Sequence, residues 1–190
     1  MSKQFLNPEI ISASQGKVAG LSYMNLSRLV RSGAMERVAR GVYGVVDAPD
    51  DRLYIEQLRR PKVVYSHGTA LYLHDLTDRD PISFSVSVPS GYNTKALLGD
   101  GFKVFSVKPE LYKANQIQLP TKYGHPVNVY GLERTICDVV RSRNRMDAEI
   151  VSTALKRYSV RRDKNISLLM RTAEKFGVSK LMRTYMEVLL

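Results

Sequence analysis

The chain has 190 residues, 44 % of them hydrophobic, which suffices for a folded core in one large domain or in a small module plus a larger one. Its 29 lysines and arginines outnumber its 18 aspartates and glutamates, and the formal net charge of +11 is attractive to a polyanion. The single cysteine, Cys137, excludes an internal disulfide and a cysteine-based zinc site. Because the chain has neither a signal peptide nor an apolar run near ~20 residues, we expect a cytoplasmic protein without a membrane partner.

Nucleic acid is the first candidate for the partner that this charge indicates, and an anionic membrane or an acidic protein is the alternative. From residue 10 to residue 32 the sequence predicts two short helices joined by a sharp turn. Ser12 is a candidate N-cap of the first helix, which closes at Gly20. The second helix is predicted over residues 23–32, because its apolar side chains share one face at spacings i, i+3 and i+4. These side chains are Leu26, Leu29 and Val30.

Two β-prone runs follow, at residues 35–38 and 42–46, and the turn between them contains Arg40 and Gly41. Helix, turn, helix and hairpin in this order are typical of a winged helix-turn-helix. The usual first helix of such a domain would have to fit within residues 1–9 or come from elsewhere in the chain. We place the end of this DNA-binding domain in the polar segment after the hairpin, which gives a first domain of residues 1–48.

A recognition helix buries one face and presents short polar or basic side chains to the major groove on the other. The second helix meets this requirement, because Arg28 and Arg31 lie opposite its apolar face, and Arg40 stands where a wing would reach the DNA backbone. The alternative is a solvated basic helix beside a hairpin. We predict DNA contacts from Lys17, Ser22, Tyr23, Asn25, Ser27, Arg28, Arg31, Arg37 and Arg40.

Residues 49–190 predict a second, mixed α/β domain, so that the fold class of the chain is α+β. Residues 83–89 alternate valine or phenylalanine with serine, which predicts a half-exposed strand and a mostly antiparallel sheet with one wet face. Helical periodicity begins at residue 132 and predicts terminal helices. The other predicted strands are 62–65, 103–107, 116–119 and 127–130, and the other predicted helices are 53–60, 69–74, 147–158, 167–176 and 180–190.

The second domain contains the residues from which an enzyme site would be built, His67 together with Glu133 and Asp138. The alternative assigns His67 and Thr69 to a helix start, and assigns Arg134, Asp138 and Arg141 to a ladder of surface ion pairs. No phosphate loop or known catalytic motif is present, so we predict a protein that is not an enzyme and that has no catalytic site, metal site or cofactor. We expect His125 in a turn and Cys137 in the core.

A second cluster of basic residues lies near the carboxyl end, where three of the seven residues from 159 to 165 are lysine or arginine. It is either a solvated loop or a second patch that contacts phosphates. The residues of this predicted patch are Lys156, Arg157, Arg161, Arg162 and Lys164.

Four segments of the chain resemble the AbiEi-type antitoxins, the antitoxin and autorepressor half of bacterial abortive-infection toxin–antitoxin systems. The first two, GLSYMNLSRLVRSG at residues 20–33 and ERVARGVY at residues 36–43, are similar to the winged-helix start of these proteins. The others are YSHGTALYLH at residues 65–74 and VYGLERTICD at residues 129–138. Their occurrence in this order is more specific than any one of them alone.

The resemblance implies a type IV antitoxin that acts in defence against phage and represses its own operon. Such a protein binds inverted repeats of double-stranded DNA in its promoter, and its carboxyl domain neutralises a nucleotidyltransferase-type toxin encoded beside it, without requiring a stable complex. Contact with this toxin or with its nucleic-acid substrate is a further alternative for the second basic patch, and an oligomer on the DNA stays open. The alternatives are a stand-alone DNA-binding regulator without a toxin partner, and an enzyme centred on His67 and on Glu133 and Asp138.

Overall fold

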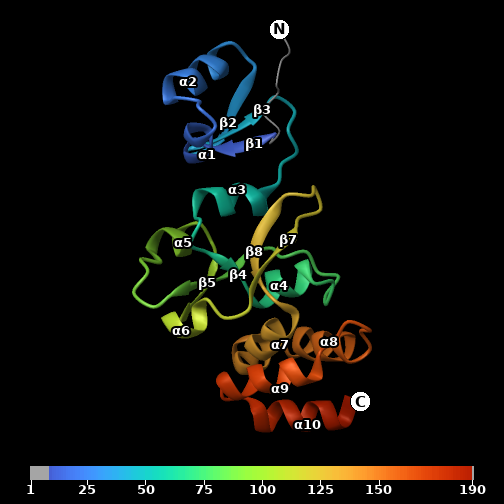
Figure 1. Ribbon diagram of the computed structural model, residues 1–190. Coiled ribbons are helices and arrows are strands. Elements are labelled where there is room, and N and C mark those ends of the chain that lie inside the picture. The colour runs from blue at the N-terminus through green and yellow to red at the C-terminus, as the bar shows by residue number, and fades with distance from the viewer. Residues whose placement is uncertain (1–8, 190) are drawn as a thin grey trace. The chain divides into compact units, whose positions relative to one another are not determined.

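The computed structural model of the chain describes residues 9–189 (Figure 1). The chain divides into two compact units. Among the described residues, unit 1 contains residues 9–62 together with Pro120–Pro126, and unit 2 contains Val63–Leu119 and residues 127–189. Both units combine a sheet with helices, and the chain closes with a run of helices, so the predicted α+β fold class is confirmed.

Unit 1 contains the predicted pair of helices and the predicted hairpin. The sheet has the strand order β1-β3-β2, and both strand pairs are antiparallel. Strand β1 is absent from the sequence prediction, because its three residues are too few to show an alternating pattern. The elements are β1 (Ile10–Ser12), α1 (Ala13–Val18), α2 (Tyr23–Arg31), β2 (Met35–Ala39), β3 (Val42–Val45) and α3 (Arg52–Arg59).

Short polar side chains fix where the two helices begin. Ser12 forms a capping box with Gln15, in which the Ser12 hydroxyl accepts from the Gln15 N–H and the Gln15 amide oxygen accepts from the Ser12 N–H at 2.8 Å. Ser22 caps α2 by accepting from the N–H of Asn25 at 3.2 Å. Gly20, at φ +82°, makes the sharp turn between the helices, since it adopts a left-handed conformation that most residues avoid.

The core of unit 1 joins the helix pair to the sheet and includes Leu26 of α2. Helix α3, which lies outside residues 1–48, also packs on all three strands and belongs to unit 1. The question whether a first helix fits within residues 1–9 concerns residues that lie almost entirely outside the described part of the chain. Unit 1 thus extends past residue 48, and the assignment of function to residues 1–48 and 49–190 stays a prediction.

A buried carboxylate, that of Asp51, organises the end of unit 1. It caps α3 by accepting from the N–H of Tyr54 at 3.1 Å, and it also accepts from the hydroxyl of Thr121. His125 lies in the expected loop, where its Nδ1 is 2.8 Å from Asp51 and its ring stacks on Tyr54 at a centroid distance of 4.4 Å. The loop residues 120–126 therefore belong to unit 1 for a specific reason, which the sequence pattern did not show.

Unit 2 is built on a five-stranded sheet with the order β6-β5-β4-β8-β7. The pairs β4–β8 and β5–β6 are parallel and β4–β5 is antiparallel, so the sheet is mixed where we expected mostly antiparallel pairing. Parallel neighbours need a crossover segment, and short helices in the connections provide it. The strands are β4 (Val64–Tyr65), β5 (Ser85–Pro89), β6 (Lys103–Val107), β7 (Gln116–Pro120) and β8 (Pro126–Tyr130).

The prediction that β5 is half-exposed is wrong. Ser85 and Ser87 are as buried as the valines beside them, because helix α4 (His67–Leu73) packs on this strand. Their polar groups are satisfied there: the N–H of Ser85 donates to the hydroxyl of Thr69, and the hydroxyl of Ser87 donates to that of Ser66 at 2.9 Å. Serine pairs with serine or threonine inside this layer, so alternation of polar and apolar residues does not mark a wet face.

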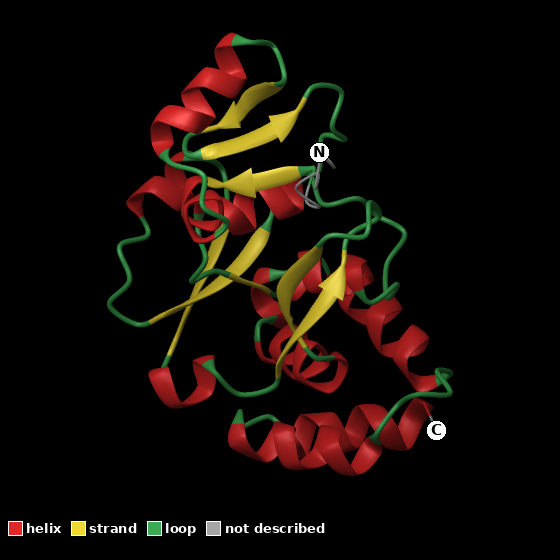
Figure 2. Ribbon diagram, turned by 45° about the horizontal axis from the view of Figure 1, so that its top comes forward, coloured by secondary structure: helices red, strands yellow, loops and turns green. Residues whose placement is uncertain are grey.

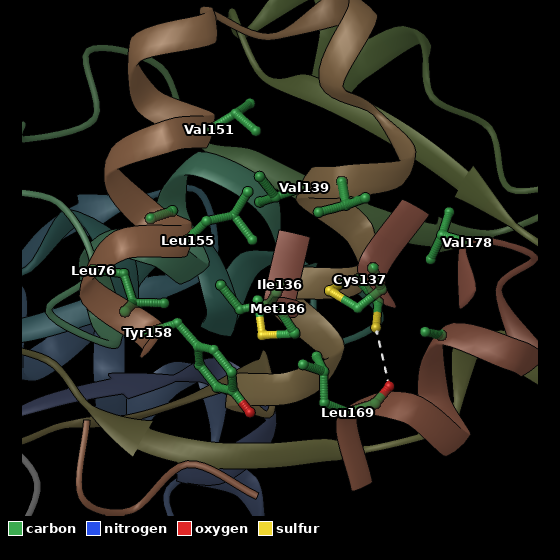
Figure 3. Close-up of a cluster of buried hydrophobic side chains, with 14 of the residues drawn as sticks. Leu76, Ile136, Cys137, Val139, Val151, Leu155, Tyr158, Leu169, Val178 and Met186 are labelled. Atoms are coloured by element: carbon green, nitrogen blue, oxygen red, sulfur yellow. Dashed lines mark hydrogen bonds between the residues drawn. The ribbon is translucent and has the colours of Figure 1, made fainter. Parts of the chain in front are cut away.

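Helices form the remainder of unit 2, and α7, α8, α9 and α10 pack together around one apolar core (Figures 1 and 3). Cys137 lies in this core, as predicted, with its sulfur 3.7 Å from the Leu169 carbonyl oxygen, and burial raises the pKa of its thiol to about 12. The helices are α5 (Lys95–Gly99), α6 (Pro109–Tyr112), α7 (Leu132–Arg141), the 3₁₀ turn η1 (Arg143–Arg145), α8 (Ala148–Ser159), α9 (Ile166–Lys175) and α10 (Ser179–Leu189).

Within residues 9–189, none of the helices, which are coloured red in Figure 2, has both the length and the apolar character needed to cross a membrane.

Candidate nucleic-acid interface

Helix α2 separates an apolar face from a basic one. Leu26 is fully buried, with Leu29 and Val30 half-buried beside it. Arg28 and Arg31 are exposed on the opposite side, where helical geometry aligns them with Met24 at spacings i, i+4 and i+7. The helix therefore presents two guanidinium groups to solvent while its other face holds it to the core of unit 1.

The charge on this face is not neutralised within the described part of the chain. Arg28 and Arg31 form no ion pair with any residue from 9 to 189, although Glu36 lies only a few residues away in the sequence. Free guanidinium groups on an exposed helix can each contact a phosphate or a base edge. The interpretation of α2 as a recognition helix requires that its arginines be accessible to a ligand, and in the folded protein they are exposed.

The remaining predicted contact residues lie on three different elements. Lys17 is exposed in the last turn of α1, Arg37 is exposed on β2, and Arg40 is exposed in the two-residue turn of the hairpin beside Gly41. At the start of α2, Tyr23 is exposed, the hydroxyl of Ser22 is engaged as the cap, and the two other polar residues, Asn25 and Ser27, are half-buried.

Two exposed apolar residues are absent from the predicted set. Val18 is 91 % exposed and Met24 is 78 % exposed, while the neighbouring Tyr23 is 69 % exposed, so the end of α1 and the start of α2 present apolar area to solvent. Apolar side chains at the start of a recognition helix can contact thymine methyl groups in the major groove. The sequence contains this signal, since Met24 shares the stripe of Arg28 and Arg31, but the predicted set rests on polar and basic side chains.

The second predicted basic patch is largely engaged in pairs within unit 2. Arg157 forms a two-pronged ion pair with Asp78, and Arg161 forms one with Asp163 at 2.8 Å while donating to the carbonyl oxygen of His74. Lys164 donates to the Arg161 carbonyl oxygen at 3.3 Å. Lys156 and Arg162 are the members without such a partner among residues 9–189.

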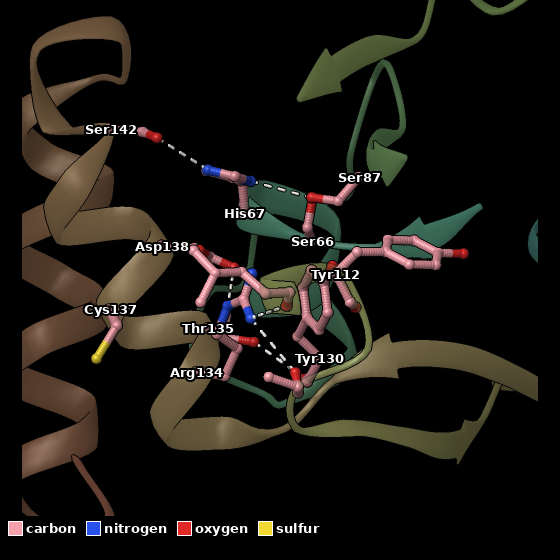
Figure 4. Close-up of polar contacts among 12 residues, drawn as sticks. Ser66, His67, Ser87, Tyr112, Tyr130, Arg134, Thr135, Cys137, Asp138 and Ser142 are labelled. Atoms are coloured by element: carbon pink, nitrogen blue, oxygen red, sulfur yellow. Dashed lines mark hydrogen bonds and ion pairs between the residues drawn. The ribbon is translucent and has the colours of Figure 1, made fainter. Parts of the chain in front are cut away.

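The expected surface ladder on α7 is wrong, because two of its three members, Arg134 and Asp138, are buried and only Arg141 is exposed. Arg134 Nε lies 2.9 Å from Asp138 Oδ2, as the i,i+4 spacing predicted, but Arg134 is only 1 % exposed (Figure 4). Its Nη1 donates to the carbonyl oxygens of Leu111 and Ala114. Glu133 does not join this pair; its Oε1 accepts from the backbone N–H of Asn165 at 2.9 Å.

His67 occupies the first position of α4 and is buried in a chain of hydroxyl groups (Figure 4). Its Nδ1 is 3.0 Å from the Ser66 oxygen and its Nε2 is 2.9 Å from the Ser142 oxygen. Burial, followed by the charges of Arg145, Arg134 and Arg141, lowers its pKa to about 3, so the imidazole is neutral. Thr69, predicted to help cap this helix, instead accepts from Ser85 of the sheet. Residues 9–189 contain no group of three potential metal-ligating side chains.

The comparison with protein families supports the interpretation of unit 1. Residues 6–46 match the family described as transcriptional regulator, AbiEi antitoxin. The resemblance stated from the sequence is confirmed over these residues. The matched segment contains both helices and the hairpin, and with them every predicted DNA-contact residue. The resemblance of residues 65–74 and 129–138 lies outside the match and stays a prediction.

Two further comparisons add little to this result. No protein with a curated functional description matches the chain. Among solved structures, the Rv2827c protein from Mycobacterium tuberculosis aligns with 95 % of this chain and 76 % of its own, at 10 % sequence identity and a TM-score of 0.48.

Proposed function

We propose that the chain is an antitoxin of a type IV toxin–antitoxin system that also represses its own operon, acting in the cytoplasm where promoter DNA lies. The DNA-binding part rests on one observation. Arg28 and Arg31 are exposed, without ion-pair partners among residues 9–189, on a helix whose other face is buried. In this proposal α2 enters the major groove and the β2–β3 hairpin is the wing, with Arg40 against the backbone.

The proposed contacts divide into two kinds. Lys17, Arg28, Arg31, Arg37 and Arg40 supply the charge that displaces counterions, which is a sequence-independent source of affinity. Tyr23, Asn25 and Ser27 lie nearest the base edges in a helix that inserts by its amino end, and they carry sequence readout. Inverted repeats place two copies of α2 on one face of the duplex, about one helical turn apart.

The antitoxin part of the proposal is supported by the family match and by the likeness of residues 65–74 and 129–138 to the same proteins. The proposed partner is a nucleotidyltransferase-type toxin encoded beside this chain, neutralised without a requirement for a stable complex. The part that neutralises it is proposed to lie after residue 48. The function requires no catalytic group on this chain.

The first experiment measures binding of the full chain to a duplex from its own promoter over a range of salt concentrations. Replacing both Arg28 and Arg31 by alanine removes two exposed cations from α2, and we expect weaker binding and a salt slope reduced by up to ~2 units. The matched control is Arg171→Ala with Arg183→Ala, which removes the same charge from two exposed positions on α9 and α10. Equal binding by the α2 variant and the control would refute the assignment of α2.

The second experiment separates repression from neutralisation in the full chain. When the toxin is co-expressed from an unrelated promoter, the Arg28→Ala, Arg31→Ala variant should rescue growth as well as the parent does. Loss of rescue by the parent itself, with promoter binding intact, would favour the stand-alone regulator. Loss of rescue by the variant alone would place neutralisation on the DNA-binding face.

A further inference from the structure

Unit 2 contains a polar cleft that the proposed function does not use. Its volume is about 630 Å³, which is in the range of small-molecule sites. Three parts of the unit line it: the first residue of α4, the strand β6, and the corner where α7 ends and η1 begins. The polar side chains of the lining are His67, Ser106, Asp138, Arg141, Ser142, Asn144 and Arg145.

Two arginines give the cleft its positive charge. Arg141 and Arg145 are exposed, and neither forms an ion pair with any residue of the described part of the chain. The guanidinium of Arg145 lies over the Phe105 ring at 4.9 Å and that of Arg141 lies 5.9 Å from the Phe176 ring. The carbonyl end of α7 alone would favour a cation, so these two side chains are what make the corner attractive to an anion.

The base of the cleft is rigid and already organised. His67 is stacked on Phe105 at a centroid distance of 3.4 Å and is bonded on both ring nitrogens, through Ser66 and Ser142. Its backbone is left-handed, with φ +48°, which is uncommon for a residue other than glycine. Such strain persists where the surroundings over-determine a conformation, and it clusters at ligand sites. Because the imidazole is neutral, the positive charge of the cleft comes from the arginines and not from His67.

Asp138 is the acidic group of the lining, and its charge is compensated. It is 5 % exposed and is bonded to the buried Arg134. Burial, partly opposed by Arg134, raises its pKa to about 6. The Arg134–Asp138 pair is neutral as a whole, and Arg141 and Arg145 therefore leave the cleft with two uncompensated positive charges.

We propose that this cleft binds a phosphate monoester of a small molecule, with the phosphate held between Arg141 and Arg145. Two guanidinium groups match the double negative charge of a monoester, and their planar N–H edges match the geometry of its oxygens. Asn144 and Ser106 add hydrogen-bonding groups at the lining. The cleft is larger than a phosphate group needs, and the remaining volume, bordered by Val104 and Val107, accommodates the organic part of the ligand.

A duplex is the less suitable ligand for this site. Its phosphates lie on a rigid convex surface, each carries one charge, and the buried side chains of His67 and Asp138 lie at the base of a concavity. The inference is independent of the DNA contacts proposed for α2, because it concerns residues of unit 2 alone. Its failure would leave the DNA-binding proposal unaffected.

The test is calorimetric titration of the full chain at low ionic strength with three probes: AMP, inorganic phosphate and adenosine. AMP should bind most tightly, inorganic phosphate more weakly, and adenosine should give no heat of binding. Replacing Arg141 or Arg145 by glutamine should weaken AMP binding about tenfold for each arginine, because each supplies a charge-assisted hydrogen bond. Both side chains are exposed, so the folded state should be preserved, as a thermal melt would verify.

The matched control is Arg171→Gln with Arg183→Gln, which lowers the net charge equally outside the cleft and should leave AMP affinity within a factor of two. Binding of adenosine as tight as AMP, equal affinity of the cleft variant and this control, or no binding of AMP would each overturn the proposal. Displacement of AMP by duplex DNA from an Arg28→Gln, Arg31→Gln variant would also overturn it, because the cleft would then be a backbone contact.

Discussion

Helices α2 and α7 use the same residue type in opposite ways. In α2, Arg28 and Arg31 are exposed and have no ion-pair partner among residues 9–189, and the helix is held in place by Leu26. In α7, Arg134 is buried, paired with Asp138, and enclosed between the rings of Tyr130 and Phe176 at 4.0 and 3.8 Å.

The difference shows why counting basic residues does not locate a nucleic-acid interface. A guanidinium contributes to polyanion binding only when its charge is not already neutralised and its N–H groups can be reached. Of the basic residues in the two predicted patches, those on α2 meet both conditions, whereas Arg157 and Arg161 are committed to Asp78 and Asp163.

The largest effect is expected from Arg134→Met. The change leaves the Asp138 carboxylate buried without its partner, and removing one member of a buried pair typically costs about 3–5 kcal/mol. Urea denaturation followed by circular dichroism would measure the loss of unfolding free energy. The double variant Arg134→Met, Asp138→Leu should recover most of it, because no buried charge then remains. A single variant as stable as the parent would show that Arg134 is not buried in the folded protein.

A pH-dependent effect of intermediate size is expected from His67. Its pKa is lowered from 6.5 to about 3 by burial and by nearby arginines, so the unfolded chain binds a proton more readily than the folded one between these values. Stability from the neutral imidazole is complete above about pH 6.5 and is lost as the pH falls toward 3. Asp138 has the opposite sign, since its raised pKa makes the protein lose stability as the pH rises from about 4 to 6.

The variant His67→Gln isolates the histidine from this opposing carboxyl group. The destabilisation that it causes should be smaller at pH 4.5 than at pH 7.5 by on the order of 2–3 kcal/mol, because only the parent has a buried imidazole to protonate. Urea denaturation of the parent and the variant at both pH values gives this difference. A destabilisation independent of pH would mean that His67 is not held in its neutral form.

The smallest effect is expected from Arg157→Ala. Its side chain is paired with Asp78, and both groups are at the surface, where such pairs contribute little to stability. We expect no measurable change in melting temperature and no change in the salt slope of DNA binding. A reduced salt slope would show that DNA displaces Asp78 from Arg157, and the second basic patch would then be part of the interface.

The sequence alone determined those helices and turns that depend on short-range signals, such as helix caps, a turn glycine and the spacing of apolar residues. The caps at Ser12 and Ser22, the turn at Gly20 and the apolar stripe of α2 fix the helix pair, and the predicted helices after residue 132 follow from their periodicity. The exposed arginines of α2 follow from the same stripe, because the face opposite a buried one faces solvent.

Only the tertiary structure decided whether a given polar side chain is exposed to solvent or buried against other parts of the protein. Ser85 and Ser87 are buried because α4 covers them, and Arg134 is buried because its guanidinium lies between the rings of Tyr130 and Phe176. The cleft at Arg141 and Arg145 joins three segments that are far apart in the chain. Periodicity reports which residues share a face, but whether that face meets water or protein depends on long-range packing.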